Sequence, residues 1–307
     1  MSNTKVYIAR SENLEKRKLG SSGGVVSEVI LDLLNRQWHA VVPIYVSEKV
    51  KFEPRVICSP EEYIQTGSVY HDLNLVEYLR TIDIEAGRSY VVTCLPCEAK
   101  AIKKIFSDAH ANSMTIALAC SGQQSYEATE LLLNIMGIEK EDVSSFKYRG
   151  GGWPGGIQIQ TKNGKIVEAG NLQYPWYDIF NSNVFTLPKC FSCQDILGRH
   201  AELVAADPWF KKELEQEKIG RTLTICRNID IEACEGVVVD EILDEEQAQA
   251  SQGFTFRRKL IQKKYKEYLN LFIRHRKIIA SLSWAWGYII RPARVIYSKS
   301  WKLLEKL

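Results

Sequence analysis

The first half of the chain alternates between helical and strand patterns. Apolar residues at helical spacing predict a helix over 25–34, directly after a Ser/Gly turn. Short apolar runs predict buried strands over 39–46 and 114–122. Residues 90–106 begin as a strand and continue as a helix after a Cys-Leu-Pro-Cys turn. Strands that alternate with helices favour a mainly parallel sheet in this half.

The second half contains an antiparallel signal. Residues 157–169 alternate apolar and polar side chains on both sides of Asn163-Gly164, which predicts a hairpin. The Gly/Pro-rich segment 149–156 before it is a candidate subdomain boundary or active-site loop.

These patterns together predict a fold class and a division of the chain. The fold class is α/β (mixed α+β), with a partly parallel sheet and flanking helices, an antiparallel hairpin portion and a C-terminal helical tail. We expect a catalytic or binding domain over 1–255, with a candidate boundary near residue 150, and a basic amphipathic tail over 256–307.

Charge separates the tail from the rest of the chain. The 307 residues are 45% hydrophobic and 25% charged, the balance of an ordinary globular protein. Residues 257–307 hold fourteen Lys and Arg against two Glu, a net charge of +12, which leaves −9 for the preceding residues out of the total of +3. An acidic body with a basic tail indicates a catalytic or binding domain whose tail binds an anionic surface.

The tail mixes these basic residues with aromatic ones. Its longest uncharged stretch, 278–290, is 13 residues, shorter than the roughly 20 that a spanning helix needs. The pattern fits an interfacial helix with Trp284, Trp286 and Tyr288 at the headgroup level. Helices that pack on the body or on a partner subunit are the alternative. No nucleic acid is expected, because no recognised binding motif accompanies the charge.

Eight cysteines add candidate chemistry. The N-terminus MSNTKVYIAR has neither an apolar h-region nor a cleavage site, so we expect a cytoplasmic chain with reduced cysteines, peripheral at the inner face of the membrane if the tail binds it. Cys97 follows a predicted strand, Cys120 ends another, and Cys190 and Cys193 form a C-x-x-C pair. Carboxyl ends of parallel strands converge, and four thiolates suit either zinc or an iron–sulfur cluster.

Two Ser/Gly loops are candidate anion sites. Residues 20–24 (GSSGG) open the first predicted helix, so backbone N–H groups and the positive end of the helix dipole are offered to a phosphate. Residues 66–73 have the same character. Neither loop matches the Rossmann or Walker A pattern, and an ordinary capped helix start is the alternative.

Six segments in order resemble the coenzyme F420 hydrogenase/dehydrogenase beta-subunit family, which are flavin and iron–sulfur oxidoreductases. The resemblance runs from about residue 6 to residue 227. Within the family, the sequence is most similar to the bacterial branch that is found with capsule and exopolysaccharide biosynthesis enzymes. That branch lacks a fused ferredoxin domain. The segments are SSGGVV (21–26), TGSVY (66–70), LPCEA (95–99), LACSG (118–122), FKYRGGGW (146–153) and CFSCQDILGRHAELVAADPW (190–209).

The resemblance implies which residues hold cofactors. It implies a 4Fe–4S cluster bound by Cys97, Cys120, Cys190 and Cys193, with Cys94 an accidental neighbour. It also implies an FAD held by the two loops and by the Asp of the last segment. The residues are Ser21, Ser22, Gly23, Gly24, Gly67, Ser68, Tyr70 and Asp207. It assigns no catalytic acid or base.

The implied function is a flavin- and 4Fe–4S-dependent oxidoreductase that reduces a sugar or lipid-linked intermediate of surface polysaccharide biosynthesis. The expected partners are a ferredoxin or deazaflavin electron donor and, through the tail, an anionic membrane surface. The sequence departs from the family pattern at Val69, where Lys is usual, and at Ser121, where His is common. These departures keep open a catalytically lapsed membrane-associated scaffold, and the cysteines keep open a zinc-stabilised transferase.

Overall fold

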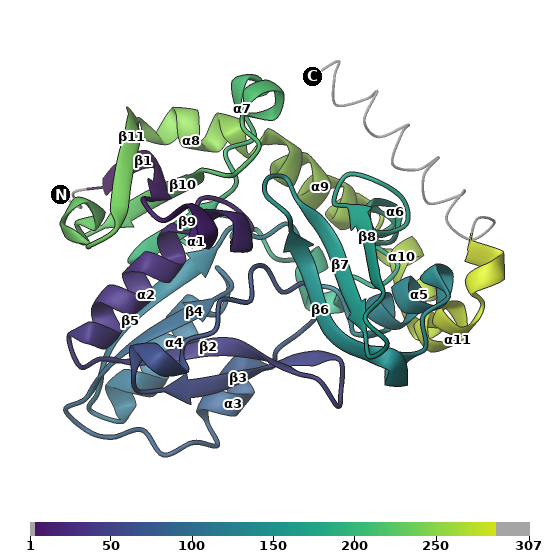
Figure 1. Ribbon diagram of the computed structural model, residues 1–307, viewed down its shortest axis with the longest axis horizontal. Coiled ribbons are helices and arrows are strands. Elements are labelled where there is room, and N and C mark those ends of the chain that lie inside the picture. Colours follow the sequence, from purple (N-terminus) through teal and green to yellow (C-terminus); the bar gives the residue numbers. More distant parts are fainter. Residues whose placement is uncertain (1–3, 287–307) are drawn as a thin grey trace.

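A computed structural model describes residues 4–286 as two sheets with covering helices (Figure 1). The larger sheet has the strand order β11-β1-β10-β9-β5-β4-β2-β3, and the smaller has the order β6-β7-β8. The larger sheet contains β1 (Thr4–Ser11), β2 (His39–Val46), β3 (Lys51–Ile57), β4 (Ser89–Cys94), β5 (Asn112–Leu118), β9 (Leu203–Ala206), β10 (Thr222–Arg227) and β11 (Val237–Leu243). The smaller contains β6 (Val143–Gly150), β7 (Gly156–Thr161) and β8 (Ile166–Gly170).

The helices lie between and around these strands. The α-helices are α1 (Leu14–Leu19), α2 (Val25–Asn35), α3 (Leu75–Leu79), α4 (Ala99–Asp108), α5 (Glu127–Met136), α6 (Trp176–Asn181), α7 (Lys211–Gln216), α8 (Glu245–Ser251), α9 (Gly253–Lys264), α10 (Lys266–Arg274) and α11 (Arg276–Ser281). Short 3-10 helices are η1 (Pro60–Glu62), η2 (Lys140–Asp142), η3 (Pro188–Phe191), η4 (Ile231–Ala233) and η5 (Ser283–Ala285).

The middle of the larger sheet is parallel. β2 pairs with β4, β4 with β5, and β5 with β9 in parallel, while β3, β10, β1 and β11 join antiparallel. The carboxyl ends of parallel strands meet at one edge of a sheet. The segments that follow β4, β5 and β9 therefore leave the sheet side by side. The predicted mixed fold, with its partly parallel sheet, is confirmed.

Helices cover both faces of this parallel region. On one face, α2 buries Val29 and Ile30 in a cluster with Val91 of β4, and on the other, α4 buries Ile102 and Phe106 in a cluster with Val92 of β4. Successive strand residues point to opposite faces, so the neighbours Val91 and Val92 serve different cores. Each fully buried aliphatic or aromatic side chain contributes about 1.5–3 kcal/mol to folding.

The smaller sheet holds the predicted hairpin. β7 and β8 pair with Ile157 opposite Ala169, and Gly164 in the turn adopts a φ of +85°, which glycine reaches without strain. The sheet packs on α5 and α6 in a separate apolar cluster that includes Phe146 and Trp176. The Gly/Pro-rich segment 149–156 connects β6 to β7, inside this sheet.

The first part of the basic tail packs on the body. α9, α10 and α11 follow one another (Figure 1); α9 and α10 contact η3, and α11 contacts α5. They bury Ile261, Leu269 and Ile279. Within residues 4–286, no helix is long and apolar enough to cross a membrane. The division of the chain at residue 255 stays a prediction.

The tail tryptophans differ from one another. Trp286 is 1% exposed and its ring lies 5.9 Å from that of Phe185, so the expectation that it lies among lipid headgroups is wrong: the ring completes the core instead. Trp284 is 78% exposed. Tyr288 lies outside the described residues.

Candidate functional site

Four cysteines meet at the edge where the parallel strands end. Cys97 lies between β4 and α4, and Cys120 follows β5, the parallel neighbour of β4. Cys190 lies in η3, and Cys193 follows it by three residues. Each of these four sulfurs influences the ionisation of at least one other of the set, although they come from three distant segments.

The sulfurs of Cys97 and Cys193 form a hydrogen bond. It raises the pKa of the Cys97 thiol, with help from burial and from Cys120, and lowers the pKa of Cys193 to about 6. Cys193 is the sulfur that ionises first, and a metal binds thiolates rather than thiols.

Burial opposes ionisation at the other two sulfurs. It raises the pKa of Cys120 to about 11 and also raises the pKa of Cys190. Backbone donors oppose this effect: the N–H of Gln123 donates to Cys190 Sγ at 3.4 Å, and the N–H of Gly122 donates to Cys120. One short loop after β5 therefore offers N–H groups to two sulfurs from different segments.

A lysine of α9 completes this environment. Lys259 is buried, and its Nζ donates to the carbonyl oxygen of Cys190 at 3.3 Å. Its positive charge lowers the pKa values of Cys120, Cys190 and Cys193. The sequence pattern gave no sign of this role, because Lys259 stands in a run of basic residues that are typical of a solvated surface.

The remaining cysteines lie elsewhere. Cys94 is buried at the end of β4, where burial and then Glu98 and Glu202 raise the pKa of its thiol well above the usual value. Cys226 and Cys234 neighbour each other, apart from the four, and Cys58 is exposed. The first cysteine of the Cys-Leu-Pro-Cys turn therefore has surroundings different from those of the second.

The four sulfurs are the donor set that a 4Fe–4S cluster uses. Among residues 4–286, no group of three or more His, Cys, Asp or Glu side chains converges closely enough to hold one metal ion. A 4Fe–4S cluster places a different demand on the protein, since each of its four irons takes one thiolate at a separate corner. The donor set, the backbone N–H groups and the buried ammonium fit that demand.

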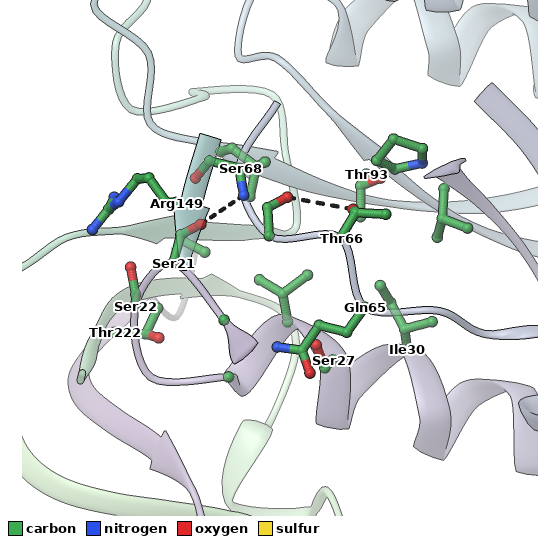
Figure 2. A pocket seen from close by; sticks show the side chains of 18 of the residues that line it. Ser21, Ser22, Ser27, Ile30, Gln65, Thr66, Ser68, Thr93, Arg149 and Thr222 are labelled. Atoms are coloured by element: carbon green, nitrogen blue, oxygen red, sulfur yellow. Dashed lines mark hydrogen bonds between the residues drawn. The ribbon is translucent and has the colours of Figure 1, made fainter. Parts of the chain in front are cut away.

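The two predicted Ser/Gly loops form the walls of one cavity (Figure 2). Its empty volume is ≈ 840 Å³, open solvent at its mouth included. Hydroxyl groups surround it, and the first turns of α2 form one side. These hydroxyls belong to Ser21, Ser22, Ser27, Tyr63, Thr66, Ser68, Thr93 and Thr222.

The loops interlock through backbone and hydroxyl groups. The N–H of Ser68 donates to Ser21 Oγ at 2.6 Å, as Figure 2 shows. Gly67 has a φ of +71°, and a Cβ there would lie 3.0 Å from the same oxygen. Gly23 passes so close to β1 that a Cβ would lie 2.8 Å from Ala9 O. Close approach to backbone therefore requires glycine at position 23, and the positive φ favours it at position 67.

Asp207 ties this cavity to the smaller sheet. Its carboxylate accepts hydrogen bonds from Ser22 Oγ at 2.7 Å, from Trp153 Nε1 at 2.8 Å, and from both terminal nitrogens of Arg149 at 2.5 and 3.1 Å. Arg149 is 2% exposed. Asp207 was predicted as a cofactor-binding residue, and in the structure its carboxylate has four protein donors, so it fixes the walls of the cavity.

Two of the predicted cofactor-binding residues do not line the cavity. Tyr70 packs in an aromatic cluster, with ring centroids 5.2 Å from Phe180, 5.5 Å from Tyr148 and 5.6 Å from Trp176. Gly23 supports the loop from behind through its N–H, which donates to Thr222 Oγ1 at 2.8 Å. Conversely, Arg149 and Thr222 line the cavity and were not predicted.

The cavity and the cysteines share one strand end. Leu118 and Ala119 line the cavity, and the next residue is Cys120. Ala119 is held in place because its N–H donates to Ala205 O at 2.9 Å. A molecule bound in the cavity therefore contacts the residue next to Cys120.

The comparisons with known proteins agree with this arrangement. A family model for the C-terminal part of the beta subunit of coenzyme F420 hydrogenase/dehydrogenase matches residues 87–250. A chain of the F420-reducing NiFe hydrogenase complex from Methanosarcina barkeri is similar in fold, with a TM-score of 0.59 and 14% identity over 85% of this chain and 91% of that chain. No curated protein matches. Since the family model covers more than half of the residues, this chain belongs to the coenzyme F420 hydrogenase/dehydrogenase beta-subunit family.

Proposed function

We propose that this family member is an iron–sulfur flavoprotein oxidoreductase, with a 4Fe–4S cluster on Cys97, Cys120, Cys190 and Cys193 and an FAD in the adjacent cavity. The observation that carries the proposal is the shared end of β5, where Ala119 faces the cavity and the next residue belongs to the cysteine group. A flavin and a cluster held side by side couple one-electron transfer to two-electron chemistry.

The cysteine group supports the cluster. Four sulfurs from three segments, the interaction of Cys97 with Cys193 and backbone N–H donors make an environment that favours thiolates. Hydrogen bonds to the sulfurs and the charge near them are the protein's means of setting the properties of such a cluster. The exposed position of Cys97 leaves one edge of the group accessible to an electron donor.

The cavity supports the flavin. The loop 20–24 leads into α2, so N–H groups and the positive helix end are available to the pyrophosphate, and Ser21, Ser22 and Ser68 surround that position with hydroxyl groups. Arg149 also lines the cavity, but its guanidinium is paired with Asp207. The neutral hydroxyl lining suits a phosphate held by hydrogen bonds, which is consistent with Val69 in place of the usual Lys.

The substrate and donor in this proposal come from the resemblance. The substrate is a sugar or lipid-linked intermediate of surface polysaccharide biosynthesis, and the electrons come from a ferredoxin or a deazaflavin. A cytoplasmic location, at the inner face of the membrane, is part of the same proposal. The basic charge of the tail supports it, since Leu260, Leu271, Ile278 and Trp284 leave apolar surface exposed beside exposed lysines.

Anaerobic purification tests the proposal. We expect about four irons per chain, broad absorbance near 400 nm from a cluster, and one FAD that is released on denaturation. Cys193→Ser is expected to lose iron. Cys94→Ser, the matched control, replaces a cysteine outside the group of four and is expected to keep the iron. Zinc without iron in the wild-type protein overturns the proposal and favours a zinc-stabilised transferase. A folded protein with neither metal nor flavin favours the scaffold.

A further inference from the structure

The buried side chain of Lys259 has an unusual set of neighbours. It is 9% exposed, whereas Lys263 and Lys264 on the same helix α9 are exposed. Burying an ammonium group is costly unless an opposite charge compensates it. Among residues 4–286, no carboxylate forms an ion pair with Lys259, and its Nζ donates to a neutral acceptor, the carbonyl oxygen of Cys190.

The ionisable groups on which its charge acts are sulfurs. The charge of Lys259 acts on Cys120, Cys190 and Cys193, which come from two different segments of the chain. An ammonium that lacks a carboxylate partner and faces three thiols is suited to an anionic centre built on those thiols.

The rest of α9 holds Lys259 in this position. Gln262 Nε2, one turn further along the helix, donates to Ser121 O at 3.0 Å and to Asn183 Oδ1 at 2.9 Å. A Cβ on Gly122 would lie 2.9 Å from the same nitrogen. Helix α9 therefore rests directly on the loop that follows β5, and it lies outside residues 87–250, which the family model matches.

We propose that Lys259 is a positioning residue of the cysteine centre, whose fixed positive charge raises the reduction potential of the 4Fe–4S cluster. This inference rests on the proposed function. One-electron reduction adds one negative charge to a centre that already carries four thiolates, with no bond made or broken and no proton moved. A cation held in a low-dielectric interior stabilises the more negative state, and net charge near a cluster is one of the factors that set its potential.

The experiment is an anaerobic redox titration of the full-length protein with dithionite as the one-electron reductant, followed by electron paramagnetic resonance. Lys259→Met and Lys259→Gln remove the charge, Lys259→Arg keeps it, and Lys263→Met removes an exposed charge from the same helix. In the neutral variants, we expect the equilibrium constant for one-electron reduction of the cluster to be about tenfold lower. This corresponds to a shift of the reduction potential by about 59 mV to lower values. Lys259→Arg and Lys263→Met are expected to match the wild type.

The outcomes separate the two proposals. No iron in the wild-type protein contradicts the proposed function itself. A full complement of iron with an unchanged potential in the neutral variants overturns the role of Lys259. If both neutral variants lose iron while Lys259→Arg keeps it, the requirement for a positive charge is supported, because charge is what Lys and Arg share. Loss of iron from Lys259→Arg as well overturns it.

Discussion

Arg149 and Asp207 form a buried, two-bonded ion pair that joins the smaller sheet to the parallel edge of the larger one. Arg149 stands near the end of β6, and Asp207 directly follows β9. The same carboxylate also holds Ser22 and Trp153, so one side chain fixes two loops and one strand around the cavity.

Replacing this carboxylate is expected to destabilise the protein. In Asp207→Asn the guanidinium of Arg149 stays buried without its counter-charge, which costs about 3–5 kcal/mol in the free energy of unfolding. The measurement is urea denaturation followed by circular dichroism. Asp108→Asn removes one partner of the exposed Lys104–Asp108 pair and is expected to change stability by less than about 1 kcal/mol. Equal effects of the two substitutions would refute the role of Asp207.

A methyl group at position 67 is expected to cost flavin binding. Gly67 and Gly87 have similar φ values, +71° and +76°, so alanine at either position is strained by about 1–2 kcal/mol. A Cβ at position 67 would also lie 3.0 Å from Ser21 Oγ, whereas nothing lies within 4 Å at position 87. We therefore expect Gly67→Ala to lose FAD and Gly87→Ala to retain it, measured as flavin per chain. Retention of flavin by Gly67→Ala would contradict this prediction.

Removal of the buried tail tryptophan is expected to destabilise the body. Trp286→Ala deletes a ring that packs beside Phe185, and a core substitution of this size costs about 3–5 kcal/mol. Trp284→Ala, two residues away, removes an exposed ring and is expected to change stability by about 0.5 kcal/mol or less. Thermal unfolding of both variants compares them. If the tail only bound a membrane and did not pack on the body, both substitutions would change stability little.

Protonation of His71 is expected to weaken the fold in mild acid. His71 is buried, its Nε2 accepts the N–H of Phe52 at 2.9 Å, and burial lowers its pKa below the usual 6.5. The unfolded chain therefore binds a proton that the folded chain does not. The contribution of neutral His71 is fully present above about pH 6.5 and is lost as the pH falls from there toward the lowered pKa, by at most about 1.4 kcal/mol per pH unit.

Denaturant unfolding between pH 7 and pH 5 measures this effect. His71→Gln is expected to remove that part of the pH dependence, and His110→Gln, at an exposed position, to keep it. If the unfolding free energy depends on pH in the same way in His71→Gln and in the wild type, other groups cause the loss of stability in acid.

Local patterns predicted the elements that position the site. The helix over 25–34 and the hairpin at Asn163-Gly164 leave a periodic pattern in the sequence. The central strands are buried on both faces and leave short apolar runs. The meeting of Cys97 with Cys193 depends on contacts between distant segments. The order of family motifs pointed to it, while spacing alone left zinc and cluster both open.

Other features leave no local trace. Arg149 and Lys259 are buried cations, and a basic residue is read from sequence as exposed unless its partner is known. Asp207 pairs with a residue 58 positions earlier, so its role follows only from the fold. Trp286 looks like an interfacial aromatic beside basic residues, yet its burial depends on the surface of α5 and on Phe185.

The contact between α9 and the loop after β5 makes the proposed metal centre dependent on the folding of distant segments. Its side chains are contributed from positions 97 to 259, so the segments that surround it must all be synthesised and docked before the site is closed. Under the proposed function, iron–sulfur assembly is then a late event that links the segment around Cys97 to helix α9. Oxygen damage would accordingly loosen the C-terminal helices as well as bleach the protein.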